Sequence, residues 1–168
     1  MAKQLTFAAY TFDELSDKAK DKARQWMRES LGANTDWADS IIDDAKQAGV
    51  FLPEWDADSG TASVHCPDVE RTVDYILANH GSECDTHKAA KAYRDAMGAI
   101  PDTGQDEDEQ ERTDAAMNIL HDELGRCYGN ALRAEMEYMF YGEGLDDTIE
   151  ANSYLFSEDG SRTVTLNA

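Results

Sequence analysis

Positive charge is scarce in this sequence. Its 168 residues include only 15 Lys and Arg against 35 Asp and Glu, which gives a formal net charge of −20 at pH 7. A protein that binds DNA or RNA directly needs basic side chains to neutralise phosphates, and an anionic membrane surface repels a chain of this charge. The composition therefore excludes direct nucleic-acid binding and attachment to anionic membranes, and it predicts a basic partner.

Cysteines and long apolar runs are also scarce. Three cysteines are an odd and small number for a disulfide framework. No stretch approaches the ~18 consecutive apolar residues typical of a membrane-spanning helix, and Met1–Leu15 lacks the apolar core of a secretory signal. We therefore expect a soluble, reduced protein in the cytoplasm. Its hydrophobic fraction of 41 % is sufficient for a folded core.

The negative charge is unevenly distributed along the chain. Residues 1–49 contain nine acidic and seven basic residues, whereas residues 50–168 contain 26 acidic and eight basic residues. A net charge of about 2–8 units is enough to keep a small domain soluble, and a larger excess costs stability through self-repulsion. Adaptation to a salt-rich cell is one explanation, but it predicts acidic residues over the whole surface. The nearly balanced first segment favours a functional explanation.

Hydrophobic periodicity and capping residues predict a mostly helical chain. In the longest predicted helix, Gly125 and Gly129 indicate either a bend or the close packing of a neighbouring segment. Ser16 is the expected N-cap of the first helix, and Leu5–Tyr10 has the character of a strand. The predicted helices cover residues 17–31, 36–48, 67–79, 85–97, 106–141 and 145–151.

Two antiparallel hairpins are predicted in addition to the helices. Val50–Leu52 and Thr61–Val64 flank a glycine-containing turn, and so do Ser153–Phe156 and Arg162–Leu166 near the end of the chain. No linker separates two hydrophobic segments. The expected fold is therefore α+β, a single domain over residues 1–168 with about four to six helices packed on a small antiparallel sheet.

Motifs that carry chemistry are few. The sequence has no phosphate-binding loop, nucleophile elbow or dinucleotide-binding motif, so we expect neither enzymatic activity nor a cofactor. Zinc prefers thiolate and imidazole ligands, which makes His65, Cys66, Cys84 and His87 weak metal candidates. The simpler interpretation is a cysteine packed in the core and histidines at the surface.

Three segments of the chain resemble those of a known group of proteins. The segments are Tyr10–Ser16 with Ala19 and Lys20, Trp37 with Asp43–Lys46, and Glu135–Tyr138 with Ile149–Gly160. They are similar to segments of a family of small phage and prophage proteins, some labelled antitoxin-like, and the resemblance implies no particular biochemical role. The middle of the chain departs from the pattern of that family. The resemblance implies a phage origin and expression inside a bacterial host, and it supplies no catalytic residue.

The acidic residues are themselves the main functional feature. Acidic side chains near a helix N-terminus are stabilised by the helix dipole, which explains only some of them. B-DNA carries one negative charge per about 1.7 Å of its axis, and carboxylates three or four residues apart on a helix lie about 5–6 Å from one another. Several acidic helices side by side would therefore resemble two rows of phosphates. The residues predicted to contact a partner are Asp56, Asp58, Asp102, Asp106, Glu107, Asp108, Glu109, Glu111, Asp114, Asp122, Glu123, Glu143, Asp146, Asp147 and Glu150, with Trp55 as an aromatic anchor.

These features favour a phage protein that inhibits a nucleic-acid-binding defence complex of the host, of the CRISPR or restriction type. Inhibition would result from DNA mimicry, in which the acidic surface occupies the basic surface that otherwise holds DNA. The alternative is an antitoxin-like or adaptor protein that binds a host or phage protein through an apolar face or Trp55. In that case the acidity serves solubility. The sequence leaves the target and the oligomeric state open.

Overall fold

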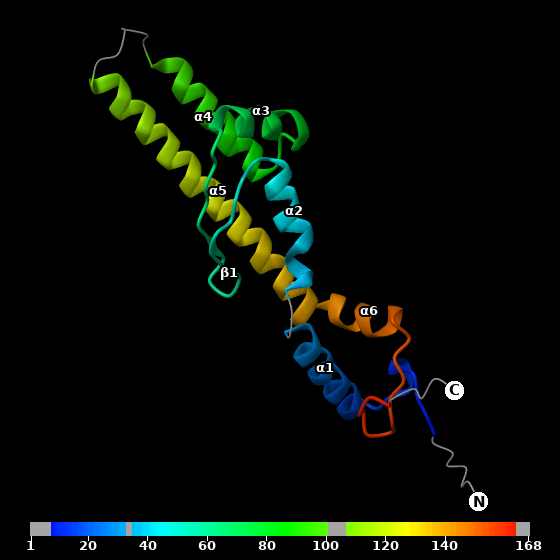
Figure 1. Ribbon diagram of the computed structural model, residues 1–168. Helices are drawn as coiled ribbons and strands as arrows, with labels where there is room; N and C mark the ends of the chain where they lie inside the picture. The colour runs from blue at the N-terminus through cyan, green and yellow to red at the C-terminus, as the bar shows by residue number, and fades with distance from the viewer. Residues whose placement is uncertain (1–7, 33–34, 101–106, 164–168) are drawn as a thin grey trace, which may run out of the picture. The chain divides into compact units, whose positions relative to one another are not determined.

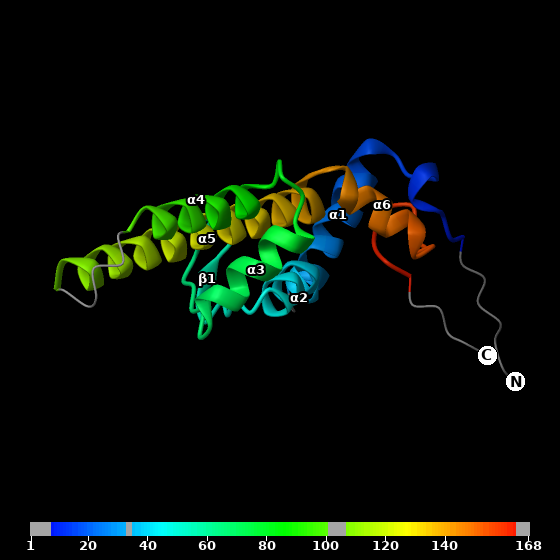
Figure 2. The same ribbon diagram turned by 90° about the horizontal axis from the view of Figure 1, so that it is seen from above.

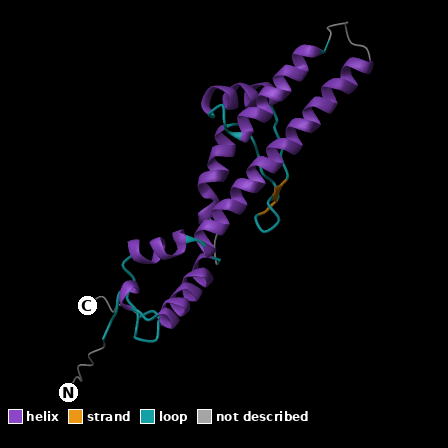
Figure 3. Cartoon of the chain, turned by 180° about the vertical axis from the view of Figure 1, so that it is seen from behind, coloured by secondary structure: helices purple, strands orange, loops and turns teal. Residues whose placement is uncertain are grey.

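The chain is mostly helical, with one small antiparallel sheet. The computed structural model describes residues 8–32, 35–100 and 107–163. Two strands pair in a hairpin, shown in orange in Figure 3. The predicted α+β class is therefore confirmed in its coarse form, as a mostly helical chain with a minimal antiparallel sheet. Along the chain (Figure 1) the elements are η1 (Phe12–Glu14), α1 (Asp17–Leu31), η2 (Asp36–Ala38), α2 (Asp39–Gln47), β1 (Trp55–Asp56), β2 (Thr61–Ala62), α3 (Val69–Asn79), α4 (Asp85–Ala99), α5 (Glu107–Tyr141) and α6 (Glu143–Ala151).

The chain divides into two compact units. Unit 1 comprises residues 1–37 and 135–168, and unit 2 comprises residues 38–134. The long helix α5 contributes to both, and each unit has its own cluster of buried apolar side chains. The expectation of a single domain stays a prediction. None of the helices in the described part of the chain has a stretch long and apolar enough to cross a membrane.

Unit 1 is built around α1 and α6. Ser16 caps α1 as predicted, because its hydroxyl oxygen accepts a hydrogen bond from the backbone N–H of Ala19 at 3.4 Å. The apolar residues of α1 recur every four positions and are buried against α6 and the segment that follows it. The buried core of unit 1 consists of Phe12, Leu15, Ala19, Ala23, Met27, Leu145, Ile149 and Phe156.

The predicted C-terminal hairpin is not formed as a pair of strands among the described residues. Phe156 instead makes two isolated bridges, one to Tyr10 and one to Arg162. Between them, Gly160 adopts a φ of +83° and lies so close to α1 that a Cβ would collide with the carbonyl group of Ala19. The turn at Gly160 therefore packs against α1, and on either side of the Phe156–Arg162 bridge the backbone N–H groups of Ser157 and Thr163 donate hydrogen bonds to the carbonyl oxygens of Ser161 and Leu155. Residues 164–166 of the second expected strand lie outside the described residues.

Unit 2 contains α2, α3, α4 and the larger part of α5. Figure 2 shows α4 running beside the first half of α5, as it also does in Figure 1. Leu120, Leu124 and Tyr128 recur every four residues on α5 and are fully or almost fully buried. They pack with Val73, Ile76, Ala90, Tyr93 and other apolar residues of α2, α3 and α4.

The β1–β2 hairpin packs directly on two glycines of α5. Trp55 pairs with Ala62 in the hairpin. A Cβ on Gly125 would lie 2.5 Å from the carbonyl oxygen of Ala62, and a Cβ on Gly129 would lie 2.7 Å from the carbonyl carbon of Gly60. Real Cβ atoms do not approach other atoms so closely. The two glycines therefore allow a neighbouring segment to pack closely on α5, which is one of the two roles that the sequence predicted for them.

Candidate functional site

The excess of acidic residues is larger in unit 2 than in unit 1. Unit 2 contains 21 acidic and eight basic residues, a net charge of −13, whereas unit 1 contains 14 acidic and seven basic residues, a net charge of −7. In unit 2 several acidic residues of α3 and α4 are neutralised locally. Arg94 pairs with Asp74 at 2.6 Å, and Lys88 pairs with Asp85 at 3.3 Å. Exposed acidic residues without a salt bridge among the described residues are instead found on α5.

One face of α5 carries four exposed carboxylates. Asp108, Glu111, Asp114 and Asp122 are all exposed, and their spacing places them along one side of the helix. Within the described residues none of the four forms a salt bridge; Asp114 accepts a hydrogen bond from the side chain of Gln110 at 2.8 Å. We call these four residues the α5 acidic face.

The charge density of the α5 acidic face is lower than that of duplex DNA. Asp108 and Asp122 are fourteen residues apart, or about 21 Å along the helix axis. A duplex of that length carries about 12 negative charges, against four on this face. The neighbouring helix α4 does not supply a second row, because Lys91 neutralises Asp95 at 2.5 Å and Lys88 neutralises Asp85. The α5 acidic face therefore corresponds to a single, widely spaced row of charges.

Three of the residues predicted to contact a partner form hydrogen bonds or ion pairs within the chain. The guanidinium of Arg24 donates two hydrogen bonds to the carboxylate of Asp146, at 2.7 and 2.8 Å, and this interaction lowers the pKa of Asp146. Arg126 pairs with Glu123. Asp56 accepts hydrogen bonds from the turn of the hairpin that follows it, and its pKa is lowered by them. These carboxylates stabilise the fold, which makes them weaker candidates for contacts with a partner.

The remaining acidic candidates are distributed over both units. Glu143, Asp147 and Glu150 are exposed in unit 1, and Asp13 raises the pKa of Glu150 by electrostatic repulsion. In unit 2, Asp58 is exposed in the turn of the hairpin and Glu109 is half-buried. Asp102 and Asp106 lie outside the described residues, and Glu107 is the first residue of α5. A continuous surface formed by all of these residues stays a prediction.

The weak metal candidates are not gathered into one site. Cys66 is buried in the core of unit 2, where desolvation raises its pKa to about 11, whereas Cys84 is exposed at the N-cap of α4. Nδ1 of His87 lies 3.0 Å from the backbone carbonyl oxygen of His80. No group of three or more His, Cys, Asp and Glu side chains that could hold a metal ion occurs within the described ranges.

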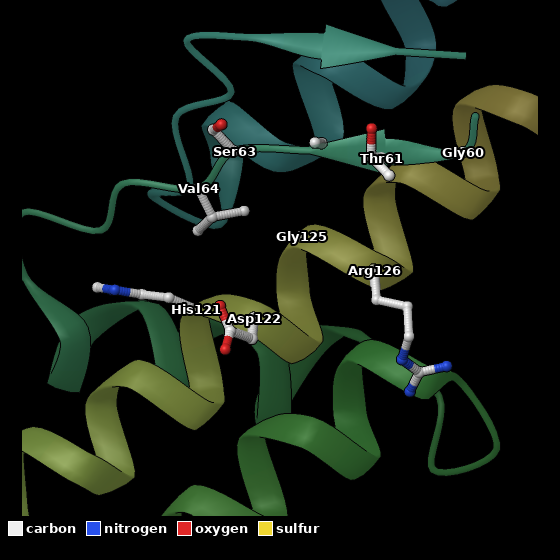
Figure 4. A pocket seen from close by; sticks show the side chains of 9 residues that line it. Gly60, Thr61, Ser63, Val64, His121, Asp122, Gly125 and Arg126 are labelled. Carbon is white, nitrogen blue, oxygen red and sulfur yellow. The ribbon is translucent and has the colours of Figure 1, made fainter. Parts of the chain in front are cut away.

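A groove of about 470 Å³ lies between β2 and α5 in unit 2. Figure 4 shows the strand segment Gly60–Val64 above the helix, with His121, Asp122 and Arg126 below it. Burial lowers the pKa of His121, and the nearby His65 adds to this effect, so the neutral imidazole is favoured. Its Nε2 atom is buried without a hydrogen-bond partner in the described structure. The groove therefore offers polar contacts, but no nucleophile paired with a base.

The aromatic anchor predicted from the sequence is only partly accessible. Trp55 is half-buried in the hairpin. The large hydrophobic side chains that the structure leaves exposed are Phe51, Ile119, Tyr138 and Tyr141. The sequence pattern predicts no functional role for these four residues. The exposure of Ile119 could have been predicted from the sequence, because Ile119 lies outside the stripe of apolar residues along the long helix.

Comparisons with known proteins found no counterpart for this chain. No family model matches it, and neither a curated protein nor a solved structure does.

Proposed function

We propose that this protein binds the basic surface with which another protein holds nucleic acid, and that it competes with nucleic acid for that surface. The resemblance of its ends to phage proteins makes a host defence complex of the CRISPR or restriction type the expected target, in the cytoplasm of the host cell. The proposed activity is inhibition by occupancy and involves no catalysis, cofactor or direct contact with nucleic acid.

The observation that carries this proposal is the α5 acidic face. Its four carboxylates are exposed, and within the described structure no basic side chain neutralises them through a salt bridge. Lys and Arg side chains that neutralise phosphates can pair with carboxylates in the same way. The net charge of −20 would also steer a basic partner and speed its association.

The spacing of the α5 acidic face specifies how such a partner would be bound. Its charge density is about a third of that of duplex DNA, so α5 would engage one row of basic side chains rather than both walls of a DNA-binding channel. Additional contacts would have to come from acidic residues on other elements, such as Asp58 in the hairpin turn.

An antitoxin-like or adaptor function is the second candidate. The exposed fractions of Ile119, 63 %, and Phe51, 52 %, favour it, because both side chains belong to unit 2 and could be buried by a partner. Binding of this kind would depend on apolar contacts and would respond weakly to salt.

The test is capture of partners from a bacterial lysate, followed by competition with labelled duplex DNA. The charge variant D108N/E111Q/D114N/D122N removes the α5 acidic face. The matched control E29Q/E54Q/E83Q/E158Q removes the same number of charges at exposed positions elsewhere. We expect the captured protein to lose DNA binding in the presence of the wild-type chain and of the control, with a steep dependence on salt. Equal capture by the charge variant and the control would refute the proposal.

A further inference from the structure

The ring of Tyr138 is held in a fixed position at the surface of unit 1. Tyr138 lies near the end of α5, and its ring packs on Gly144 in the first turn of α6, where a Cβ would lie 2.6 Å from the Cζ atom of the tyrosine. Its hydroxyl donates a hydrogen bond to the carboxylate of Asp147 at 3.4 Å. The residue is nevertheless 49 % exposed. The tyrosine side chain and the adjacent carboxylate of Asp147 are therefore both accessible to solvent.

A second aromatic ring and a second carboxylate lie nearby in the sequence and on the same two helices. Tyr141 follows Tyr138 by three residues on α5, which makes the two side chains neighbours on the helix surface, and it is 72 % exposed. Glu143 begins α6 and is exposed, as is Asp147. Neither Glu143 nor Asp147 forms a salt bridge within the described ranges. Exposed aromatic rings beside carboxylates are a suitable environment for a cation.

Unit 1 binds Arg24 with this combination of groups, and it binds Arg162 with aromatic rings. The guanidinium of Arg24 lies 5.5 Å from the centre of the Phe12 ring and makes a bidentate interaction with Asp146. Arg162 lies 4.6 Å from the centre of the Tyr154 ring. A planar guanidinium stacks on an aromatic ring while its N–H groups donate to a carboxylate, which an ammonium group does less well.

We propose that Tyr138, Tyr141 and Asp147 form a binding site for an arginine side chain of a partner protein. The guanidinium would lie against the exposed tyrosine rings and donate hydrogen bonds to Asp147, and Glu143 would add negative charge. The inference rests on the proposed function in one respect, namely that the partner is basic. It assigns a separate contact, in unit 1, that recognises arginine by shape as well as by charge.

The experiment is an NMR titration of the full chain with N-acetyl-arginine amide, with N-acetyl-lysine amide at the same ionic strength as the comparison. The ring resonances of Tyr138 and Tyr141 report binding locally, so that contacts elsewhere on an acidic protein do not contribute. We expect the arginine compound to shift these resonances and to bind at least about twofold more tightly than the lysine compound.

Two variants test the site, and one serves as a control. Y141S and D147N are each expected to weaken arginine binding about two- to fivefold and to reduce the preference over lysine. D122N removes the same charge as D147N but from unit 2, and it should leave the shifts unchanged. The amide spectrum of each variant away from the site checks that the fold is retained.

Equal shifts with arginine and lysine, or shifts that persist unchanged in both Y141S and D147N, would overturn the inference. This result would leave the proposed function untouched if the wild-type chain still competed with DNA through the α5 acidic face. Conversely, loss of that competition combined with retained arginine binding would refute the proposed function and leave the arginine site standing.

Discussion

The contact between the β1–β2 hairpin and α5 allows a quantitative prediction for Gly129. Replacing a glycine by alanine inside a helix normally stabilises it, by about 0.8–1.0 kcal/mol. At Gly129, however, the added methyl group would lie 2.7 Å from the carbonyl carbon of Gly60 and 2.8 Å from the Cα of Thr61. These are backbone atoms, so no side-chain rotation relieves the clash, and the hairpin must move away from the helix.

The two effects oppose each other, and the steric one is larger. Overpacking costs about 1–3 kcal/mol, and the upper half of that range applies because the obstacle is backbone. After subtraction of the gain in helix propensity, Gly129→Ala should lower the free energy of unfolding by about 1–2 kcal/mol. This corresponds to a fall in Tm of roughly 2–8 °C for a protein of this size.

Gly98→Ala is the matched control. Gly98 lies in α4, and a Cβ there meets no atom within 4 Å, so this substitution should stabilise the protein by about 0.5–1 kcal/mol. Urea denaturation followed by circular dichroism measures both variants. If Gly129→Ala stabilised the protein as much as Gly98→Ala does, the close packing of the hairpin on α5 would be refuted.

Two further predictions concern electrostatics and thiol reactivity. Asp146→Asn removes the charge that pairs with Arg24, and we expect a loss of about 1 kcal/mol at pH 7, because a charged hydrogen-bonded pair that is partly exposed contributes at this level. The Arg24 interaction lowers the native pKa of Asp146, so the stabilisation is present above the unfolded pKa of about 3.9 and is lost as the pH falls through the native pKa. Acid unfolding of Asp146→Asn should accordingly show a weaker pH dependence than that of the wild type. For the cysteines, a colorimetric thiol reagent at pH 8 should modify exposed Cys84 rapidly and Cys66 slowly, since Cys66 is buried and its pKa is raised to about 11; equal rates would contradict the placement of Cys66 in the core.

The helices were predictable because their signals are local. The apolar stripe and the cap at Ser16 lie within the same few turns that they organise, and α1 begins and ends where these signals indicate. The same holds for α5, whose predicted range of 106–141 agrees with Glu107–Tyr141. Boundaries that depend on neighbouring segments were less accurate. The third helix was expected to begin at residue 67, but Asp68 caps it and the helix begins at Val69.

Of the predicted C-terminal hairpin, the described residues show only isolated bridges, and residues 164–166 of its second strand lie outside them. Phe156 has the sequence context of a strand, but its partners are single residues on two sides, Tyr10 and Arg162. Gly160, in the turn between Phe156 and Arg162, packs against Ala19 of α1, and no local pattern reports a contact between residues so far apart in the chain.

For the candidate site, composition alone established the large excess of acidic residues and the expectation of a basic partner. Tertiary contacts decided which carboxylates are available. Asp146 is used by Arg24, which lies 122 residues away, whereas Asp108 and Glu111 remain exposed on α5. Charge is a sum over residues and can be counted from the sequence, but its neutralisation depends on distances of a few ångströms that arise only when the chain folds.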